Sequence, residues 1–199
     1  SINTIGLNVD IQGLNQPGSP SYDTDPYPVP FIIDIKHAEI NSFFFLDGCG
    51  SFKLENSVIT GGCLDLQGFT PTKDYYIKQN LFLHVIYMEL RTGDKNKKSY
   101  IRNNVFYDIS NIVIYNLLSS NMVMEYNSFL DIATHIYLYS SDTAELNAAN
   151  NYWNTTDDAM INTIIYDKND DLTLLSTIEY NPFLTSPHSS TPDPIPYLE

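Results

Sequence analysis

The stretch Asn104-Val-Phe-Tyr107 recurs along this chain in five similar versions. The other four are Asn56-Ser-Val-Ile59, Asn80-Leu-Phe-Leu83, Asn127-Ser-Phe-Leu130 and Asn151-Tyr-Trp-Asn154. The asparagines that open these phrases are spaced 24, 24, 23 and 24 residues apart, and each is followed two residues later by an apolar residue. A fixed period in this range is typical of a solenoid, in which each repeat buries its apolar face by stacking on its neighbours.

Polar and apolar residues alternate within each period. Ile77, Ile101 and Met124 form one inner column, Lys78, Arg102 and Glu125 form the next outer column, and Lys53 interrupts the inner column at the first repeat. An alternation of period two inside a period of about 24 predicts several short strands per repeat, with corners between them. This pattern describes the coils of a parallel β-helix.

The repeated asparagine has a physical reason to stand at a corner. Asparagine tolerates left-handed backbone angles better than other residues with a side chain, so we expect it to adopt them. Stacked on successive coils, the side-chain amides can form a hydrogen-bonded ladder, and the residue two positions later then points inward. His37 occupies a matching place in a first, imperfect repeat.

Composition excludes several classes of protein. The net charge is −14, with only ten Lys and Arg residues, so we expect no nucleic-acid partner. No apolar run is long enough to span a membrane, and we expect no insertion into one. Cys49 and Cys63 are too few for a zinc site; they are either free thiols or one disulfide.

The end of the repeat region differs from the rest. Thr155 or Thr156 can cap a helix with acidic residues in its first turn. The residues Met160, Ile161, Ile164 and Ile165 would give that helix one apolar face. Such a helix can cover the open end of the last coil.

This closing stretch, Asn150-Asn-Tyr-Trp-Asn-Thr-Thr-Asp157 with Ile165-Tyr-Asp167 and Tyr180-Asn-Pro-Phe183, resembles the closing module of secreted right-handed parallel β-helix proteins, the pectate-lyase-like superfold. Asn154 stands where that family usually has glycine, so a left-handed turn is expected there. The resemblance is specific over residues 147–184 and looser over 31–146. It implies an all-β, single-stranded right-handed parallel β-helix of about six coils with a short C-terminal capping helix, in a secreted or cell-surface protein.

The expected organisation is one β-helix domain over residues 1–184. It includes a Pro-rich loop excursion at 13–30 and a C-terminal cap at 155–184. Residues 185–199 are Pro-rich and are expected to be a tail, or a linker to further domains of a longer chain.

The strongest candidate site is an outer strip of side chains. Its members are Tyr76, Lys78, Tyr100, Arg102 and Glu125. Tyrosine rings can stack on sugars while the cations meet acidic groups, which favours a polysaccharide partner. The same pattern also suits an ordinary polar sheet face with tyrosine chosen for its strand propensity.

Three further residues, His84, Asp108 and Asp131, occupy equivalent places four residues after an asparagine. Neighbouring carboxylates at such a place can hold a cation such as Ca²⁺, or they can be solvated turn residues. We expect no other cofactor and no metal site built from known signatures.

The sequence therefore favours a carbohydrate-binding or surface-structural β-helix module without catalytic residues. The alternative is a polysaccharide lyase or glycoside hydrolase, or a fragment of one, acting on an acidic polysaccharide. Fold alone does not choose between them.

Overall fold

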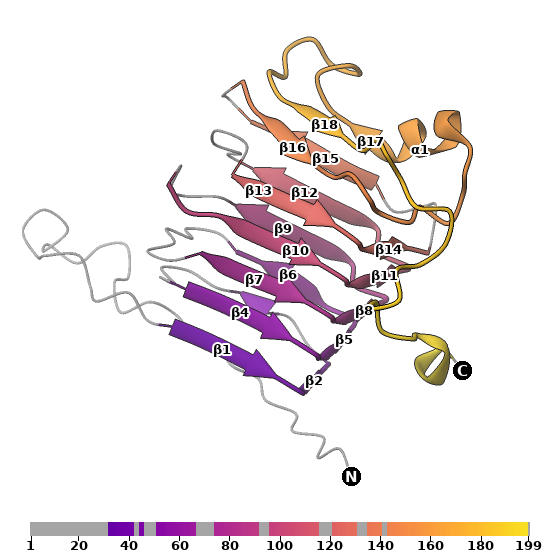
Figure 1. Cartoon of the computed structure of the whole chain (residues 1–199). Coiled ribbons are helices and arrows are strands. Elements are labelled where there is room, and N and C mark those ends of the chain that lie inside the picture. The colour runs from indigo at the N-terminus through magenta and orange to yellow at the C-terminus, as the bar shows by residue number, and fades with distance from the viewer. Residues whose placement is uncertain are drawn as a thin grey trace, which may run out of the picture.

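The computed structural model describes residues 32–41, 44–45, 51–66, 74–91, 96–115, 121–130, 135–140 and 143–198. Over these residues the strands form three parallel sheets that wind around one apolar core (Figure 1). The fold is a right-handed parallel β-helix with one short α-helix near its C-terminal end, as the sequence predicts. Residues 1–31, which include the excursion expected at 13–30, lie outside the described residues.

Three faces take the strands in rotation along the chain from β1 to β16. The seven-stranded sheet contains β1 (Ile32–Lys36), β4 (Ser51–Glu55), β7 (Tyr75–Lys78), β10 (Ser99–Arg102), β13 (Met122–Glu125), β16 (Glu145–Asn147) and β18 (Thr177–Glu179). The five-stranded sheet contains β2 (Glu39–Ile40), β5 (Val58–Thr60), β8 (Leu81–Leu83), β11 (Val105–Tyr107) and β14 (Ser128–Phe129). The six-stranded sheet contains β3 (Phe44–Phe45), β6 (Cys63–Asp65), β9 (Tyr87–Arg91), β12 (Asn111–Tyr115), β15 (His135–Tyr139) and β17 (Ile165–Tyr166). The number of coils differs slightly from the six expected, because one face continues through seven strands.

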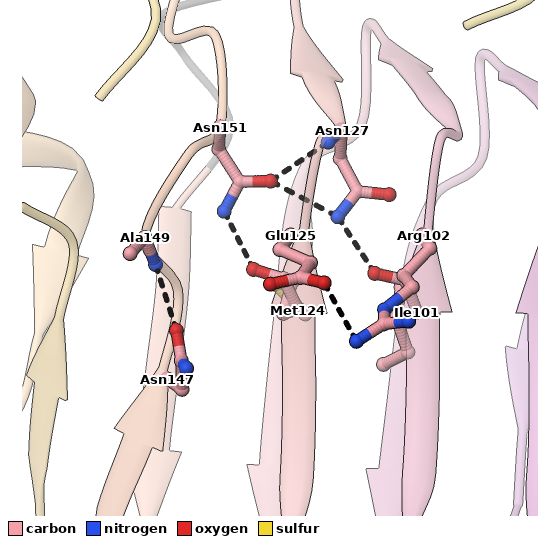
Figure 2. A network of polar contacts seen from close by, with 8 residues as sticks. All are labelled: Ile101, Arg102, Met124, Glu125, Asn127, Asn147, Ala149 and Asn151. Carbon is pink, nitrogen blue, oxygen red and sulfur yellow. Dashed lines mark hydrogen bonds and ion pairs between the residues drawn. The ribbon is translucent and has the colours of Figure 1, made fainter. Parts of the chain in front are cut away.

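The asparagine column forms a buried ladder at the corner between the seven-stranded and five-stranded sheets. Nδ2 of each asparagine donates to Oδ1 of the next at 3.0 Å, from Asn80 through Asn104 and Asn127 to Asn151. Each of these Nδ2 atoms also donates to a main-chain carbonyl one coil earlier, for example Asn127 to Ile101 O at 2.8 Å (Figure 2). Because Oδ1 also accepts from a main-chain N–H, these fully buried amides have no unmet polar atom.

The sequence predicts left-handed backbone angles at the ladder asparagines, and this prediction is wrong by one residue. The positive φ angles belong to the residues just before them: Gln79, Asn103, Tyr126 and Asn150, with φ between 56° and 59°. The left-handed residue makes the sharp turn, and the asparagine after it points into the corner to bond with the neighbouring coils. Asparagine is therefore required at this column for its amide rather than for its tolerance of left-handed angles.

The first asparagine of the sequence pattern, Asn56, is not a ladder member. Strand pairing aligns Glu55 with Lys78 and Val58 with Leu81, which places Asn56 at the left-handed position with φ 51° and Ser57 in the ladder. Ser57 N donates to Asn80 Oδ1 at 3.0 Å. His37 likewise holds the left-handed position, with φ 53°.

The first coil is shifted by one residue from the sequence pattern, and this shift corrects the predicted inward residues on two of its strands. Leu54, not Lys53, pairs with Ile77 and fills the inner column, so Lys53 faces outward without interrupting it. Ile59, not Val58, is the inward residue that pairs with Phe82. Both inward columns are therefore continuous: the column of Ile77 and Ile101 extends back to Leu54, without the gap that the sequence pattern suggested, and the aromatic column extends back to Ile59.

Aromatic rings stack inside the corner two residues after each ladder asparagine. The centroid distances are 5.2 Å for Phe82–Phe106, 5.0 Å for Phe106–Phe129 and 4.5 Å for Phe129–Trp153, with interplanar angles between 8° and 13°. All four side chains are fully buried. Burial of each ring contributes about 2 to 3 kcal/mol, so the stack is a main source of cohesion between coils.

The C-terminal end is closed by α1 (Asp158–Ile164), which contacts β15 and β17. Its N-cap is Asp157, not Thr155 or Thr156: Asp157 Oδ1 accepts from Ala159 N at 3.0 Å. Ile161 and Ile164 are buried as expected, but Met160 is exposed, and Ile165 already belongs to β17. With only seven residues, the helix is too short to bury the whole predicted face.

Three further features of the described residues bear on earlier expectations. Asn154 has a φ of 55°, which confirms the left-handed turn expected there. Cys63 carries a free thiol, and Cys49 lies outside the described residues. Among the described residues, no helix is long and apolar enough to cross a membrane.

We expect Asn104→Ala to lower the free energy of unfolding by about 2 to 4 kcal/mol, because it leaves buried donors and an acceptor on both neighbouring coils unpaired. Urea unfolding followed by circular dichroism measures the change. Asn111→Ala, which removes a half-buried asparagine on the outer side of β12, is the matched control and should change stability by less than about 0.5 kcal/mol. Equal effects of the two substitutions would contradict the ladder's role.

Candidate functional site

The five residues of the predicted outer strip lie on one face of the seven-stranded sheet. Tyr100 pairs with Tyr76, and Arg102 pairs with Lys78 on one side and Glu125 on the other. The residues between them in the chain, such as Ile77 and Ile101, are fully buried, so the strip residues point outward. The structure therefore brings the predicted residues together on the expected face.

The ring faces in this strip are turned toward one another. Tyr76 and Tyr100 stack with a centroid distance of 5.2 Å and an interplanar angle of 9°. Lys53 Nζ lies 5.7 Å from the Tyr76 centroid, and Arg102 Cζ lies 4.9 Å from the Tyr100 centroid. Each ring thus has a neighbour on both faces, and ring edges and hydroxyl groups point to solvent. A sugar would meet these groups and the cations rather than an open ring face.

Charged side chains form one outward row of the same face, in the order Lys36, Glu55, Lys78, Arg102 and Glu125. Lys36 Nζ lies 3.2 Å from Glu55 Oε2, and this carboxylate, with Asp34, raises the pKa of Lys36. Arg102 Nη2 lies 2.6 Å from Glu125 Oε1 (Figure 2). Lys78 is exposed between these two pairs, with no carboxylate in ion-pair distance among the described residues.

A second outward surface was missed in the sequence. Five tyrosines lie on the outer side of the six-stranded sheet, and we call them the tyrosine surface: Tyr87, Tyr115, Tyr137, Tyr139 and Tyr166. Tyr115 and Tyr139 stack at 5.5 Å, and Tyr137 and Tyr139 are parallel at 6.0 Å. The signal was present, because strand pairing aligns Arg91, Tyr115 and Tyr139 at intervals of 24 residues.

A nearly buried carboxylate lies at one end of the tyrosine surface. The Tyr87 hydroxyl donates to Glu89 Oε2 at 2.8 Å, and Arg91 Nε is paired with Glu89 Oε1. Arg91 Cζ lies 4.9 Å from the centroid of the Tyr115 ring. Burial, followed by the hydrogen bond to Glu89, raises the pKa of Tyr87, so its phenol stays protonated as a donor.

Glu89 has an acidic neighbour one coil earlier. Strand pairing places Asp65 beside Glu89, and both residues are buried. Burial and then the charge of Asp65 raise the pKa of the Cys63 thiol. This is the one place among the described outer faces where two carboxylates on adjacent coils lie next to an arginine.

At the other end of the tyrosine surface, the Tyr166 hydroxyl lies 3.4 Å from Asp171 Oδ2. Hydrogen bonds from Thr173 lower the pKa of Asp171, and burial followed by the Asp171 charge raises the pKa of Tyr166. Burial also raises the pKa of Tyr139. Tyr87, Tyr139 and Tyr166, whose pKa values are raised, therefore stay neutral hydrogen-bonding groups at physiological pH.

His84 and Asp108 form an exposed pair at the corner between the five-stranded and six-stranded sheets. His84 Nδ1 lies 2.6 Å from Asp108 Oδ2, and both residues have positive φ. Asp131, the third member of this predicted set, lies outside the described residues. No group of three metal-ligating side chains occurs within the described parts of the chain.

Comparison with known proteins adds no relative: no family model matches the chain, and no curated protein or solved structure is significantly similar to it.

We expect Glu89→Gln to destabilise the protein by about 2 to 4 kcal/mol, because it leaves the half-buried Arg91 guanidinium without its counter-charge. Glu125→Gln breaks a more exposed pair and should cost less than about 1 kcal/mol. Thermal and urea unfolding of both variants measure the difference. A larger effect of Glu125→Gln would show that the Glu89 pair is the less important of the two.

Proposed function

We propose that this chain is a non-catalytic β-helix module that binds extended polysaccharide chains on its outer faces, in a secreted or cell-surface protein. The single observation that carries the proposal is the place of two lysines on one face of an acidic chain. Only ten Lys and Arg residues occur in the sequence, yet four of them point outward from the seven-stranded sheet: Lys36, Lys53, Lys78 and Arg102. Lys36 and Arg102 are paired with Glu55 and Glu125, whereas Lys53 and Lys78 form no ion pair with the described carboxylates, so an acidic glycan repelled by most of the surface could approach at these two lysines.

The regular geometry of the sheet suits a polymer as the ligand. Equivalent side chains recur on successive coils at the spacing of parallel strands, about 5 Å. A linear chain lying along the solenoid axis could therefore make the same contact more than once. Repeated weak contacts of this kind add up through multivalency. The tyrosine surface offers a second face of the same type, with phenol hydroxyls as hydrogen-bonding groups.

The resemblance to pectate-lyase-like proteins supports this proposal through the closing module. Asn154 adopts the left-handed turn at the position where that family has glycine. Asp167 is buried and accepts from Asn169 N at 2.7 Å and from Ile178 N at 2.7 Å, which fixes the turn after the helix. We propose that residues 147–184 are this closing module and that the protein is secreted or surface-exposed. We also propose that Asp108, at the corner between the five-stranded and six-stranded sheets, is the place where Ca²⁺ could bind.

The alternative is an enzyme that cleaves polysaccharides, and one observation favours it. Asp65 and Glu89 are carboxylates on adjacent coils, beside Arg91 and the Tyr87 hydroxyl. Glycoside hydrolysis uses two carboxyl groups that flank the scissile bond. We prefer the binding module because Glu89 is already engaged by Arg91 and Tyr87, and because both carboxylates are buried.

A glycan array followed by affinity measurements tests the proposal. We expect binding to acidic glycans, and we expect Lys78→Glu to weaken it by about tenfold or more, since one favourable charge contact becomes a repulsive one. Lys168→Glu, which makes the same change on an exposed lysine after α1, is the matched control and should leave affinity unchanged.

Other outcomes separate the alternatives. A loss of binding with Tyr139→Ala but not with Lys78→Glu would move the site to the tyrosine surface. Release of reducing sugars or of unsaturated products from any bound glycan, abolished by Glu89→Gln in folded protein, would establish the enzyme. If no glycan on the array bound, the binding proposal would fail and the surface-structural role would be left.

A further inference from the structure

The chain does not leave the β-helix after its last strand. Leu184 N donates to Asn151 O at 2.8 Å, and Leu184 pairs with Tyr152 beside the five-stranded sheet. The chain then turns back and runs past β14, β11 and β8 toward the N-terminal end of the solenoid (Figure 1). We call residues 185–198 the strap.

The strap lies on the left-handed column that precedes the asparagine ladder. Thr191 Oγ1 donates to Tyr126 O at 3.2 Å, and Gln79 Nε2 donates to Ser190 O at 3.4 Å. The His188 ring packs against the Tyr126 ring with a centroid distance of 4.7 Å. These contacts are few and mostly made by side chains, so the strap is held far less firmly than a strand in a sheet.

His188 is the central contact, and its hydrogen bonds fix its charge state. Asn103 Nδ2 lies 3.1 Å from His188 Nδ1, and Ser190 N donates to the same atom at 3.2 Å. A side-chain NH₂ group and a main-chain N–H can only donate, so Nδ1 must accept and carries no proton. The strapped arrangement therefore holds a neutral imidazole, with its proton on Nε2.

Protonation of the ring is incompatible with this arrangement. It would place an N–H at Nδ1 against two donors. Asn103 could rotate its amide to offer Oδ1, but the Ser190 N–H would still lose its acceptor. Loss of even one such contact matters for a segment that has so few.

Among the described residues, no neighbouring charge is placed to offset that cost. The other titratable group packed on the ring is the Tyr126 phenol. Of the charged residues next to these corner positions, Arg102 and Glu125 are paired with each other, and Lys78 is a cation that cannot stabilise a second positive charge. Asp193, the acid within the strap, accepts from Ile195 N at 3.0 Å.

We propose that the strap is a pH-sensitive latch, fastened to the corner by neutral His188 and released when His188 gains a proton in mild acid. Release frees a Pro-rich segment whose end carries the exposed apolar residues Ile195, Tyr197 and Leu198. The freed segment could then reach another molecule, which the fastened strap cannot do. This latch is independent of glycan binding.

Nuclear magnetic resonance on the full ¹⁵N-labelled chain tests the latch. Ring nitrogen shifts should show His188 protonated only on Nε2 at pH 8. Backbone ¹⁵N relaxation should show an ordered strap at pH 8 and, across the range in which histidines titrate, a rise of about tenfold in the population of the mobile strap by pH 5. The side-chain amide signals of the asparagine ladder should persist throughout.

Two variants sharpen the test. Asn103→Asp offers an acceptor to a protonated Nδ1, so we expect strap release to move to lower pH by about one unit. His188→Phe keeps a ring against Tyr126 but cannot be protonated, and its strap mobility should not change between pH 8 and pH 5. Asn147→Asp makes the same chemical change as Asn103→Asp at an exposed position away from the strap and is the matched control.

Several results would overturn the proposal. These are a proton on Nδ1 at pH 8, a strap equally ordered at both pH values, and loss of the ladder signals together with strap order. An equal shift caused by Asn147→Asp would show that release follows overall charge rather than His188.

Discussion

The hydrogen bond between stacked asparagine amides is the constraint on which the rest of this structure depends. An amide has two donors and two acceptor sites, and in a buried column all four can be met only if adjacent coils are in register. In this column Asn104, Asn127 and Asn151 meet all four, and Asn80 makes both donor bonds and accepts one from Ser57 N. A slip of one residue would leave several buried polar groups unpaired at each coil, at a cost of about 1 to 3 kcal/mol for each group. The ladder therefore fixes the alignment of every strand that enters or leaves the corner.

That alignment also determines the outer faces. Since equivalent residues stack directly above one another, an outward tyrosine meets the side chain of the next coil before it meets solvent. Tyr76 and Tyr100 consequently cover each other, and a cation covers each remaining ring face. Charged residues follow the same logic, because opposite charges on adjacent coils attract: Lys36 pairs with Glu55, and Arg102 pairs with Glu125. Arg102 also has Lys78 on its other side, so the row contains one pair of like charges. The surface is a consequence of the register as much as of any ligand.

The period of the sequence was enough to predict the solenoid, the inward aromatics and the shared face of Tyr76, Lys78, Tyr100, Arg102 and Glu125. It failed at the first coil, where Asn56 suggests a 24-residue repeat but the hydrogen bonds follow Ser57, one residue later. Two small polar residues in succession leave that choice to strand pairing, which a local pattern does not contain. The tyrosine surface was readable from the 24-residue interval between Arg91, Tyr115 and Tyr139, but this interval lies on a different face from the asparagine column. The strap was not readable, because its contacts join residues far apart in the chain, such as His188 and Asn103.

The aromatic stack ends on Trp153, the single tryptophan of the chain, which lies fully buried against Tyr180 near the C-terminal end of the solenoid. Solenoids lose structure most readily at their ends, because a terminal coil has a neighbour on one side only. Tryptophan emission from this protein is therefore a local probe of its C-terminal end and not a reporter of the whole molecule. Fluorescence would follow the opening of the last coils, whereas circular dichroism would follow the sheets as a whole. A difference between the two signals would be the signature of a fold that comes apart coil by coil.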